Sequence, residues 1–185
     1  MLQNRTFAIA TVTLGLLVTS SASASASAAT RCEGAPAAAA AARALSPSRE
    51  AILCLVNVER GERGLPALRA NDDLERAAQR HSADMVERHF FDHDSPGGTS
   101  VRERVERTGY LRGARRWSLG ENIGWAARSI SSPAGMVKAW MESPGHRDII
   151  LTRTFREAGV GIAMGVPTGR GAGATFTMNF GLSAR

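Results

Sequence analysis

The spacing of apolar residues predicts helices in the first part of the chain and strands mainly near its end. Apolar residues recur three and four positions apart in several segments, where each would form one buried stripe of a helix. Two late segments alternate apolar with small residues around a loop rich in Gly, Pro and Thr, which is typical of a β-hairpin. The expected helices are 48–60, 71–88, 100–108, 132–142 and 144–150, and the expected strands are 119–125, 158–165 and 174–181.

Capping residues support the helix boundaries. Asn71 precedes three acidic residues, which suit the positive end of a helix dipole. Ser100 and Glu103 have the spacing of a capping box, and Ser132 before Pro133 is a helix start signal. Because helices come mainly first and antiparallel strands mainly last, the order favours an α+β domain over a doubly wound parallel sheet.

The first residues predict export from the cell. Residues 1–28 contain one cation, an apolar run from Phe7 to Val18 and a Ser/Ala tract, as in a secretory signal peptide. The apolar run is shorter than the roughly 20 residues of a spanning helix. We expect an Ala-rich linker at 29–47, one domain at 48–185, and a secreted, extracellular protein without a transmembrane segment.

The charge of the chain adds little about specific partners. The formal net charge is +6, and nearly all the cations are arginine. Such a charge predicts loose attraction to anionic polymers without specificity, so we expect no specific nucleic-acid partner. The basic stretch 111–118 is expected to be exposed surface, and a nuclease assisted by Arg112 to Arg116 would rest on charge alone.

Cys32 and Cys54 are expected to form a disulfide, because paired cysteines in an exported chain usually do so. The bond would close a short loop and contribute about 3 kcal/mol of stability. A metal or redox pair is the alternative, which the long separation and the absence of a second pair disfavour.

Glu142 and His146 lie where one helix ends and another begins. A carboxylate at a helix C-terminus opposes the helix dipole by about 0.3 to 1 kcal/mol, so helix propensity does not explain Glu142. Ser143 can cap the new turn and Pro144 can open it. Either the pair is structural, with a capping carboxylate and a hydrogen-bonded histidine, or both groups belong to a site.

The remaining histidines give weaker indications of a functional site. His81 lies seven positions after Leu74 on an apolar stripe, so we expect it in the core. A metal site formed by His81, His89 and His93 is an alternative, although a Phe-Phe-Asp segment interrupts their spacing.

Four motifs resemble the CAP superfamily, the cysteine-rich secretory, antigen 5 and pathogenesis-related proteins, in its bacterial secreted form with an SCP-like domain. The similarity covers about 52–182 and implies a three-layer α-β-α sandwich around a small antiparallel sheet. The motifs are F-D-H-D-S-P at 91–96, G-E-N-I at 120–123, A-W-M-E-S-P-G-H-R at 139–147, and G-V-G-I-A to F-T-M-N-F-G within 159–181.

The resemblance implies a cleft tetrad of His93, Glu121, Glu142 and His146. Imidazoles are good ligands for Zn or Cu, so His93 and His146 are the expected ligands of zinc or another divalent metal. Carboxylates can ligate the metal or hold an imidazole N–H. This chain has Asn179 where many bacterial relatives have Gln, which puts the role of the last strand in the cleft in doubt.

Two functions follow from this cleft. The first is a secreted, monomeric binding module for a small-molecule or cell-wall ligand. The alternative is a metal-assisted extracellular hydrolase of peptide or cell-wall substrates, with Glu121 or Glu142 as the general base. The sequence contains no other recognisable nucleophile motif, so it leaves open whether the protein is an enzyme.

Overall fold

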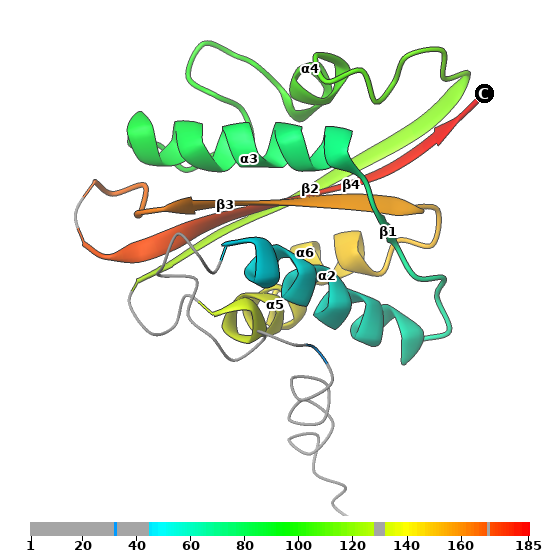
Figure 1. Cartoon of the computed structure of the whole chain (residues 1–185), viewed down its shortest axis with the longest axis horizontal. Coiled ribbons are helices and arrows are strands. Elements are labelled where there is room, and N and C mark those ends of the chain that lie inside the picture. The colour runs from blue at the N-terminus through cyan, green and yellow to red at the C-terminus, as the bar shows by residue number, and fades with distance from the viewer. Residues whose placement is uncertain (1–31, 33–44, 128–131, 170) are drawn as a thin grey trace, which may run out of the picture.

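The computed structural model describes residue 32 and residues 45–127, 132–169 and 171–185. The predicted signal peptide lies outside these residues, as does most of the predicted linker. The described elements form three layers, with a sheet between two groups of helices (Figure 1). One face of the sheet carries α3 (Asp72–Glu87) and α4 (Val101–Glu106), and the other carries α2 (Leu45–Gly61), α5 (Pro133–Glu142) and α6 (Pro144–Ile150).

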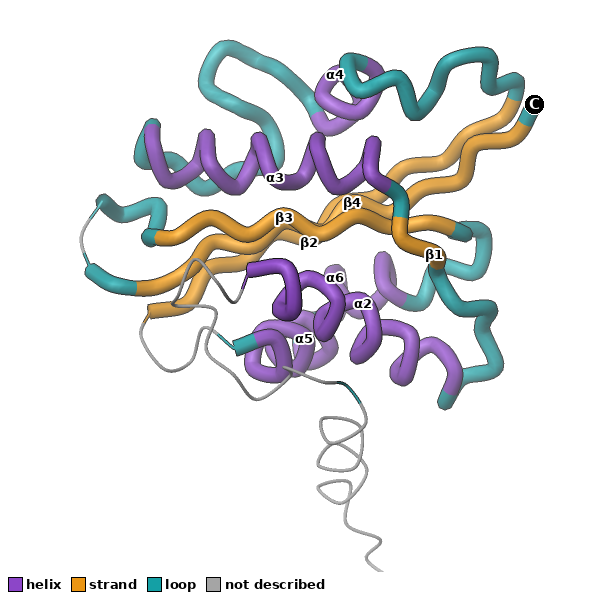
Figure 2. The backbone as a smooth tube through the Cα atoms, viewed as in Figure 1, coloured by secondary structure: helices purple, strands orange, loops and turns teal. Residues whose placement is uncertain are grey.

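The sheet has the strand order β1-β3-β4-β2. Its members are β1 (Arg69–Ala70), β2 (Arg116–Ala127), β3 (Glu157–Met164) and β4 (Gly173–Ala184). The predicted hairpin is confirmed as the antiparallel β3–β4 pair, and β2 pairs antiparallel with β4 over its whole length. The short β1, in the connection between α2 and α3 (Figure 2), pairs in parallel with β3, so the sheet is mixed. The α+β prediction is confirmed.

Two glycines of β3 allow α3 to lie directly on the sheet. A Cβ at Gly159 or Gly161 would overlap the backbone of the facing turns of α3. This close approach lets Gln79 of α3 bond both backbone groups of Ile162, donating to its carbonyl at 3.0 Å and accepting from its N–H at 3.0 Å. The α3 layer is therefore joined to the sheet by backbone contact.

The larger apolar core lies on the opposite face, beneath α2, α5 and α6. Trp140 of α5 is buried there, and its Nε1 donates to the carbonyl of Ile123 on β2 at 3.1 Å. The strand β4 contributes Phe176, Met178 and Phe180 to the same core. Because strand residues alternate between faces, the residues between these, including Asn179, face α3.

Arg60 joins the end of α2 to the end of α6. Its side chain is fully buried. Among the described residues the guanidinium donates only to backbone carbonyls, those of Pro66 at 3.0 Å, Ile150 at 2.6 Å, Thr152 at 3.0 Å and Phe155 at 3.4 Å. Burial lowers the pKa of Arg60, with a smaller effect from neighbouring arginines. The four carbonyls hold this buried cation without a carboxylate.

The predicted disulfide between Cys32 and Cys54 is confirmed. Cys32 is buried against α2, and the Cα atoms of the two cysteines are 5.8 Å apart. The bond joins Cys32 to α2, and both cysteines pack in the larger apolar core. None of the helices in the described ranges has the length and hydropathy to cross a membrane.

Candidate functional site

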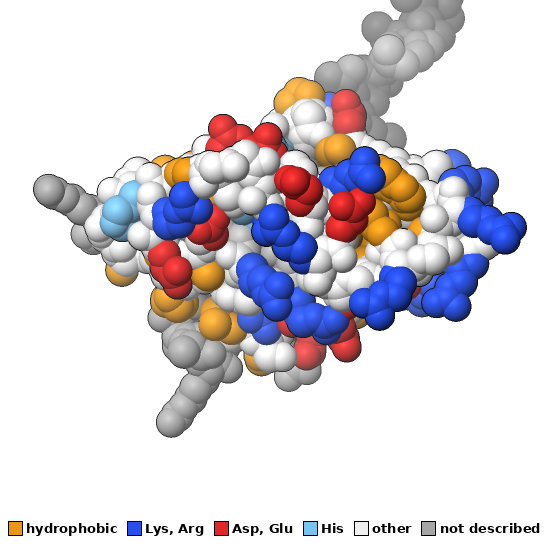
Figure 3. All heavy atoms as spheres, turned by 90° about the horizontal axis from the view of Figure 1, so that it is seen from above, with side chains coloured by type: hydrophobic (Ala, Val, Ile, Leu, Met, Phe, Trp, Pro, Cys, Tyr) orange, Lys and Arg blue, Asp and Glu red, His pale blue; other side chains and the backbone are white. Residues whose placement is uncertain are grey.

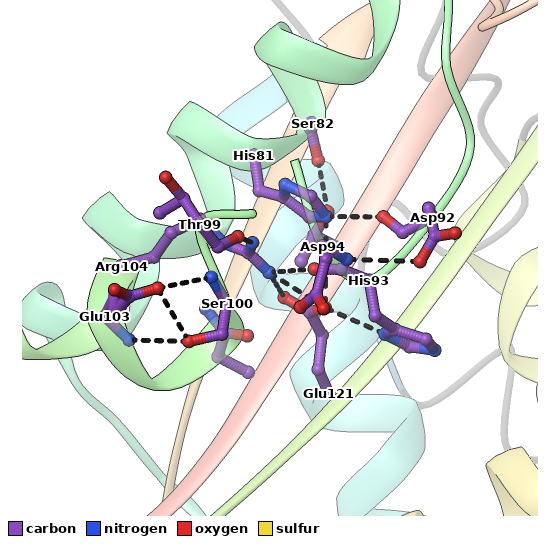
Figure 4. Close-up of polar contacts among 12 residues, drawn as sticks. His81, Ser82, Asp92, His93, Asp94, Thr99, Ser100, Glu103, Arg104 and Glu121 are labelled. Carbon is purple, nitrogen blue, oxygen red and sulfur yellow. Dashed lines mark hydrogen bonds and ion pairs between the residues drawn. The ribbon is translucent and has the colours of Figure 1, made fainter. Parts of the chain in front are cut away.

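Glu121 on β2 is the centre of a buried polar cluster (Figure 4). Its side chain is only 2% exposed. Arg104 Nη2 donates to Oε1 at 3.1 Å and to Oε2 at 2.9 Å, and His93 Nδ1 lies 2.9 Å from Oε1. Asn179, with its amide oriented so that both of its groups find partners, donates to Oε2 at 3.0 Å. Since every partner is a donor, the carboxylate acts as a fixed acceptor.

Arg104 reaches the cluster from α4. The predicted capping box is confirmed, with Ser100 and Glu103 bonded reciprocally at the start of this helix. Beyond Glu121, Arg104 donates to the carbonyls of Thr99 at 2.9 Å and His93 at 2.8 Å. One buried guanidinium therefore fixes both the carboxylate and the backbone that carries His93.

His93 lies in the loop between α3 and α4, with its side chain half exposed. An ionised carboxylate accepts hydrogen bonds and cannot donate them. Nδ1 of His93 therefore carries the proton in the contact with Glu121. This hydrogen bond raises the pKa of His93, partly opposed by burial of the ring. In the neutral ring, Nε2 is left as the nitrogen with a free lone pair.

The prediction that His81 belongs to the core is confirmed, because it is completely buried. Its Nε2 donates to the carbonyl of Asp92 at 3.0 Å and lies 3.9 Å from Glu121 Oε1. Burial lowers the pKa of His81. Nδ1 is buried without a hydrogen-bond partner among the described residues. His81 thus supports the loop that presents His93.

His146 lies near the start of α6, across β2 from His93. Asn122 donates to the carbonyl of His146 at 3.1 Å, while the neighbouring Glu121 bonds His93. Consecutive strand residues point to opposite faces, so the two histidines flank the edge strand. Burial lowers the pKa of His146, and the nearby charge of His93 lowers it further.

Ser143 orients the ring of His146 instead of capping α6. It occupies the N-cap position, but its hydroxyl makes no capping hydrogen bond within the helix. Its Oγ lies 2.9 Å from Nδ1 of His146. Either partner can be the donor here, because a hydroxyl both donates and accepts.

Glu142 lies at the boundary between α5 and α6. It is the last residue of α5, its side chain is 67% exposed, and its Oε1 lies 3.5 Å from Lys138 Nζ. The structure therefore joins His93 directly to Glu121, while the assignment of His146 and Glu142 to the same cleft stays a prediction.

Arg104 and Asn179 belong to the cluster although the sequence did not indicate it. Arg104 is one of several arginines in V-R-E-R-V-E-R, and nothing in that pattern separates it from its exposed neighbours. In the sequence, Asn179 differs from the residue of many bacterial relatives, which gives no sign of a contact with Glu121. Its alternation with the apolar residues of β4 is the signal that places it on the α3 face.

The cluster fits a resident metal ion only in part. No group of three or more His, Cys, Asp or Glu side chains among the described residues could hold a metal. The alternative triplet of His81, His89 and His93 is accordingly not formed. Protein zinc sites use three or four protein ligands, whereas two imidazoles supply two.

The fold is that of an SCP-type domain, and comparison with known proteins agrees. The model of the Cysteine-rich secretory protein family, CAP, matches residues 53–180. The chain belongs to this family.

Two Bacillus proteins illustrate the relationship. YkwD, an uncharacterized protein of Bacillus subtilis, is 35% identical over 118 residues, which cover 64% of this chain and 43% of YkwD. The structure of an extracellular protein containing a SCP domain from Bacillus anthracis is similar, with 29% identity and a TM-score of 0.62 over 74% of this chain and 41% of that one. The chain therefore matches less than half the length of either protein.

Similar proteins also include a structure of lower sequence identity and a protein named as a membrane protein. An outer surface protein of Borrelia burgdorferi shares the fold, with a TM-score of 0.60 and 18% identity over 72% of this chain and 90% of that one. YlbC of Bacillus subtilis, an uncharacterized membrane protein, is 35% identical over 62% of this chain and 31% of its own length.

Proposed function

We propose that this protein is an extracellular binding domain that holds a small or wall-derived ligand between His93 and His146. The observation that carries the proposal is the 2.9 Å contact between His93 Nδ1 and Glu121. It fixes the ring and its tautomer and leaves Nε2 to accept from, or coordinate, a ligand. Carboxylates that hold ligating histidines in this way are common behind metal sites.

A divalent transition metal is the simplest probe of such a pair. Zinc would use one nitrogen from each imidazole, and the remaining positions would be filled by the ligand or by solvent, since the cluster supplies only two donors. The metal would then be part of what is bound, as a bridge between the protein and its ligand.

The geometry gives less support to the hydrolase alternative. A general base must reach the proton that it removes. The oxygens of Glu121 are engaged by Arg104, His93 and Asn179, and its side chain is almost fully buried. Glu142 is paired with Lys138. Glu121 is therefore not free to act as a base, and in the described part of the chain no hydrogen bond directs the exposed Glu142 toward a cleft.

Calorimetric titration of Zn²⁺ into metal-stripped protein tests the proposal. We expect micromolar or tighter binding by the wild type and its loss in His93→Ala/His146→Ala. His89→Asn is the matched control, because it removes an exposed histidine outside the pair and Asn tolerates the positive φ of that position. Equal binding by the wild type and the double variant, or no binding by either, would contradict the proposal.

A further inference from the structure

Four exposed arginines gather where β2 begins and β4 ends. Arg112 and Arg115 lie in the turn before β2, Arg116 is the first residue of β2, and Arg185 follows β4. A Cβ at Gly113 in the turn would lie 4.0 Å from Nε of Arg185, so the turn and the end of β4 are adjacent. We call these four residues the arginine cluster. Cationic side chains gather at this end of the molecule in Figure 3.

The arginine cluster is not neutralised within the described part of the chain. None of its four guanidinium groups has a side-chain hydrogen bond or an ion pair there, whereas Arg63 pairs with Glu59 at 2.8 Å and Arg88 with Asp84 at 3.4 Å. Grouped like charges repel one another and destabilise the compact state. Stability of the fold therefore does not account for the arginine cluster.

An open hollow beside the cluster leaves these cations available. Arg112 and Arg185 line it together with Tyr110 and Glu157. Glu157 already accepts from the hydroxyl of Tyr110 at 2.8 Å and from Arg69 at 3.4 Å. The other acid that lines the hollow, Asp73, is paired with Arg76. Both carboxylates are thus engaged, and an anionic group from another molecule would meet unpaired guanidinium groups.

The arrangement fits a flexible, linear partner. Guanidinium groups bind phosphate through two parallel hydrogen bonds, as they also bind carboxylate. The four residues come from one turn and from the ends of two paired strands, so they lie along the end of the sheet. A flexible chain can contact them one after another.

An exposed aromatic side chain extends the surface. Trp117 follows the cluster on β2 and is 42% exposed. The guanidinium of Arg102 lies 5.2 Å from the centroid of its ring, which holds the indole in place. Its free area offers an apolar surface to the carbon backbone of a polymer.

We propose that the arginine cluster binds a linear phosphodiester polymer of the cell surface. Arg116 is five residues from Glu121 along β2, about 17 Å in an extended strand, so the polymer would leave the cleft accessible. The proposal rests on the proposed extracellular location and is independent of ligand binding by His93 and His146. It adds a binding role to the expectation that this basic stretch is exposed surface.

The test compares binding of a delipidated glycerol-phosphate polymer by the wild type and by Arg112→Gln/Arg115→Gln/Arg116→Gln/Arg185→Gln. We expect this variant to bind the polymer at least about tenfold more weakly than the wild type. The slope of log affinity against log salt concentration should also decrease in magnitude by about three, because each of four lost phosphate contacts contributes about 0.7 for a single chain. The control removes the same charge from four exposed arginines elsewhere, Arg63→Gln/Arg80→Gln/Arg88→Gln/Arg153→Gln, and should bind nearly as well as the wild type.

Three outcomes would overturn the proposal. The first is an equal loss in both variants, which would show that net charge alone drives binding. The second is no binding of the polymer by the wild type at physiological salt. The third is binding only to vesicles of equimolar phosphatidylcholine and phosphatidylglycerol, which would assign the surface to a membrane. Zinc titration of the cluster variant separates this test from that of the cleft, because zinc binding should be unchanged in it.

Discussion

Arg104 and Glu121 form a buried ion pair in which one guanidinium nitrogen contacts both carboxylate oxygens, at 3.1 and 2.9 Å. The two side chains are only 8% and 2% exposed. Two buried charges that lose their hydration are tolerated when they are paired and further hydrogen-bonded. The contacts of Arg104 with Thr99 and His93, and those of Glu121 with His93 and Asn179, supply these additional bonds.

Breaking this pair from one side should therefore destabilise the fold strongly. We expect Glu121→Gln or Arg104→Met to lower the free energy of unfolding by about 3 to 5 kcal/mol, because each leaves a buried charge uncompensated. The double variant Glu121→Gln/Arg104→Met should lose clearly less unfolding free energy than the sum of the two single losses. Urea denaturation measures all three, and an additive double variant would show that the two charges are not coupled.

The exposed pair of Lys138 and Glu142 is the matched control for that cycle. Its atoms are 3.5 Å apart, and the side chains are 72% and 67% exposed. Surface pairs contribute little because water and salt screen them, so Glu142→Gln should change stability by less than about 1 kcal/mol.

The pKa of His93 should depend on Glu121. In the wild type the hydrogen bond to the carboxylate raises this pKa, and Glu121→Gln should lower it because a neutral amide stabilises the imidazolium less. Histidine NMR titration measures the shift, and Glu142→Gln should leave the pKa of His93 unchanged. Equal pKa values of His93 in the wild type and in Glu121→Gln would show that the contact is not formed in solution.

The sign of the stability effect follows from the raised pKa. Protonated His93 stabilises the folded state fully below the pKa of an unfolded histidine, about 6.5, and this contribution is lost as pH rises through the higher folded pKa.

His81 should act in the opposite direction. Burial lowers the pKa of His81 in the folded state. Below about pH 6.5 the unfolded chain therefore takes up a proton that the folded protein does not, and the free energy of unfolding decreases as the pH is lowered. His81→Gln cannot titrate and can still donate to the carbonyl of Asp92. Between about pH 7 and pH 5 the free energy of unfolding should decrease more for the wild type than for His81→Gln. An equal decrease in both proteins would contradict this account.

Gly161 should not tolerate a side chain. Gly161→Ala would place a Cβ against the backbone of α3 and should cost about 3 kcal/mol or more, because neither backbone can move easily. Gly145→Ala in α6 is the control, since nothing lies within 4 Å of its Cβ position, and the higher helix propensity of Ala should stabilise it by up to about 1 kcal/mol. Thermal unfolding of both variants distinguishes backbone contact from a general effect of replacing glycine.

Local signals in the sequence predicted most of the secondary structure. Asn71, Ser100 and Ser132 all cap the helices that they were expected to cap, because a side-chain oxygen next to free N–H groups is a short-range feature. The strand β1 was missed because two residues carry no alternation, and their parallel pairing with β3 depends on where α3 packs.

The candidate site was predictable only where motifs mark it. The family resemblance indicates His93, Glu121, Glu142 and His146, of which the structure shows the contact between His93 and Glu121. Arg104 lies among similar arginines and is distinguished only by its contacts in three dimensions. Ser143 was expected to cap α6, yet its hydroxyl contacts His146 instead. Such a choice between two nearby partners depends on packing that no local pattern encodes.

The carbonyl contacts of Arg60 have a consequence for ligand binding. They hold the C-terminal end of the short helix that carries His146, while Arg104 holds the backbone of His93 on the other side of β2. Both imidazoles are thus attached to segments that are already ordered before a ligand arrives. Association should require little reordering of the chain, so that most of the interaction free energy of a ligand would appear as affinity.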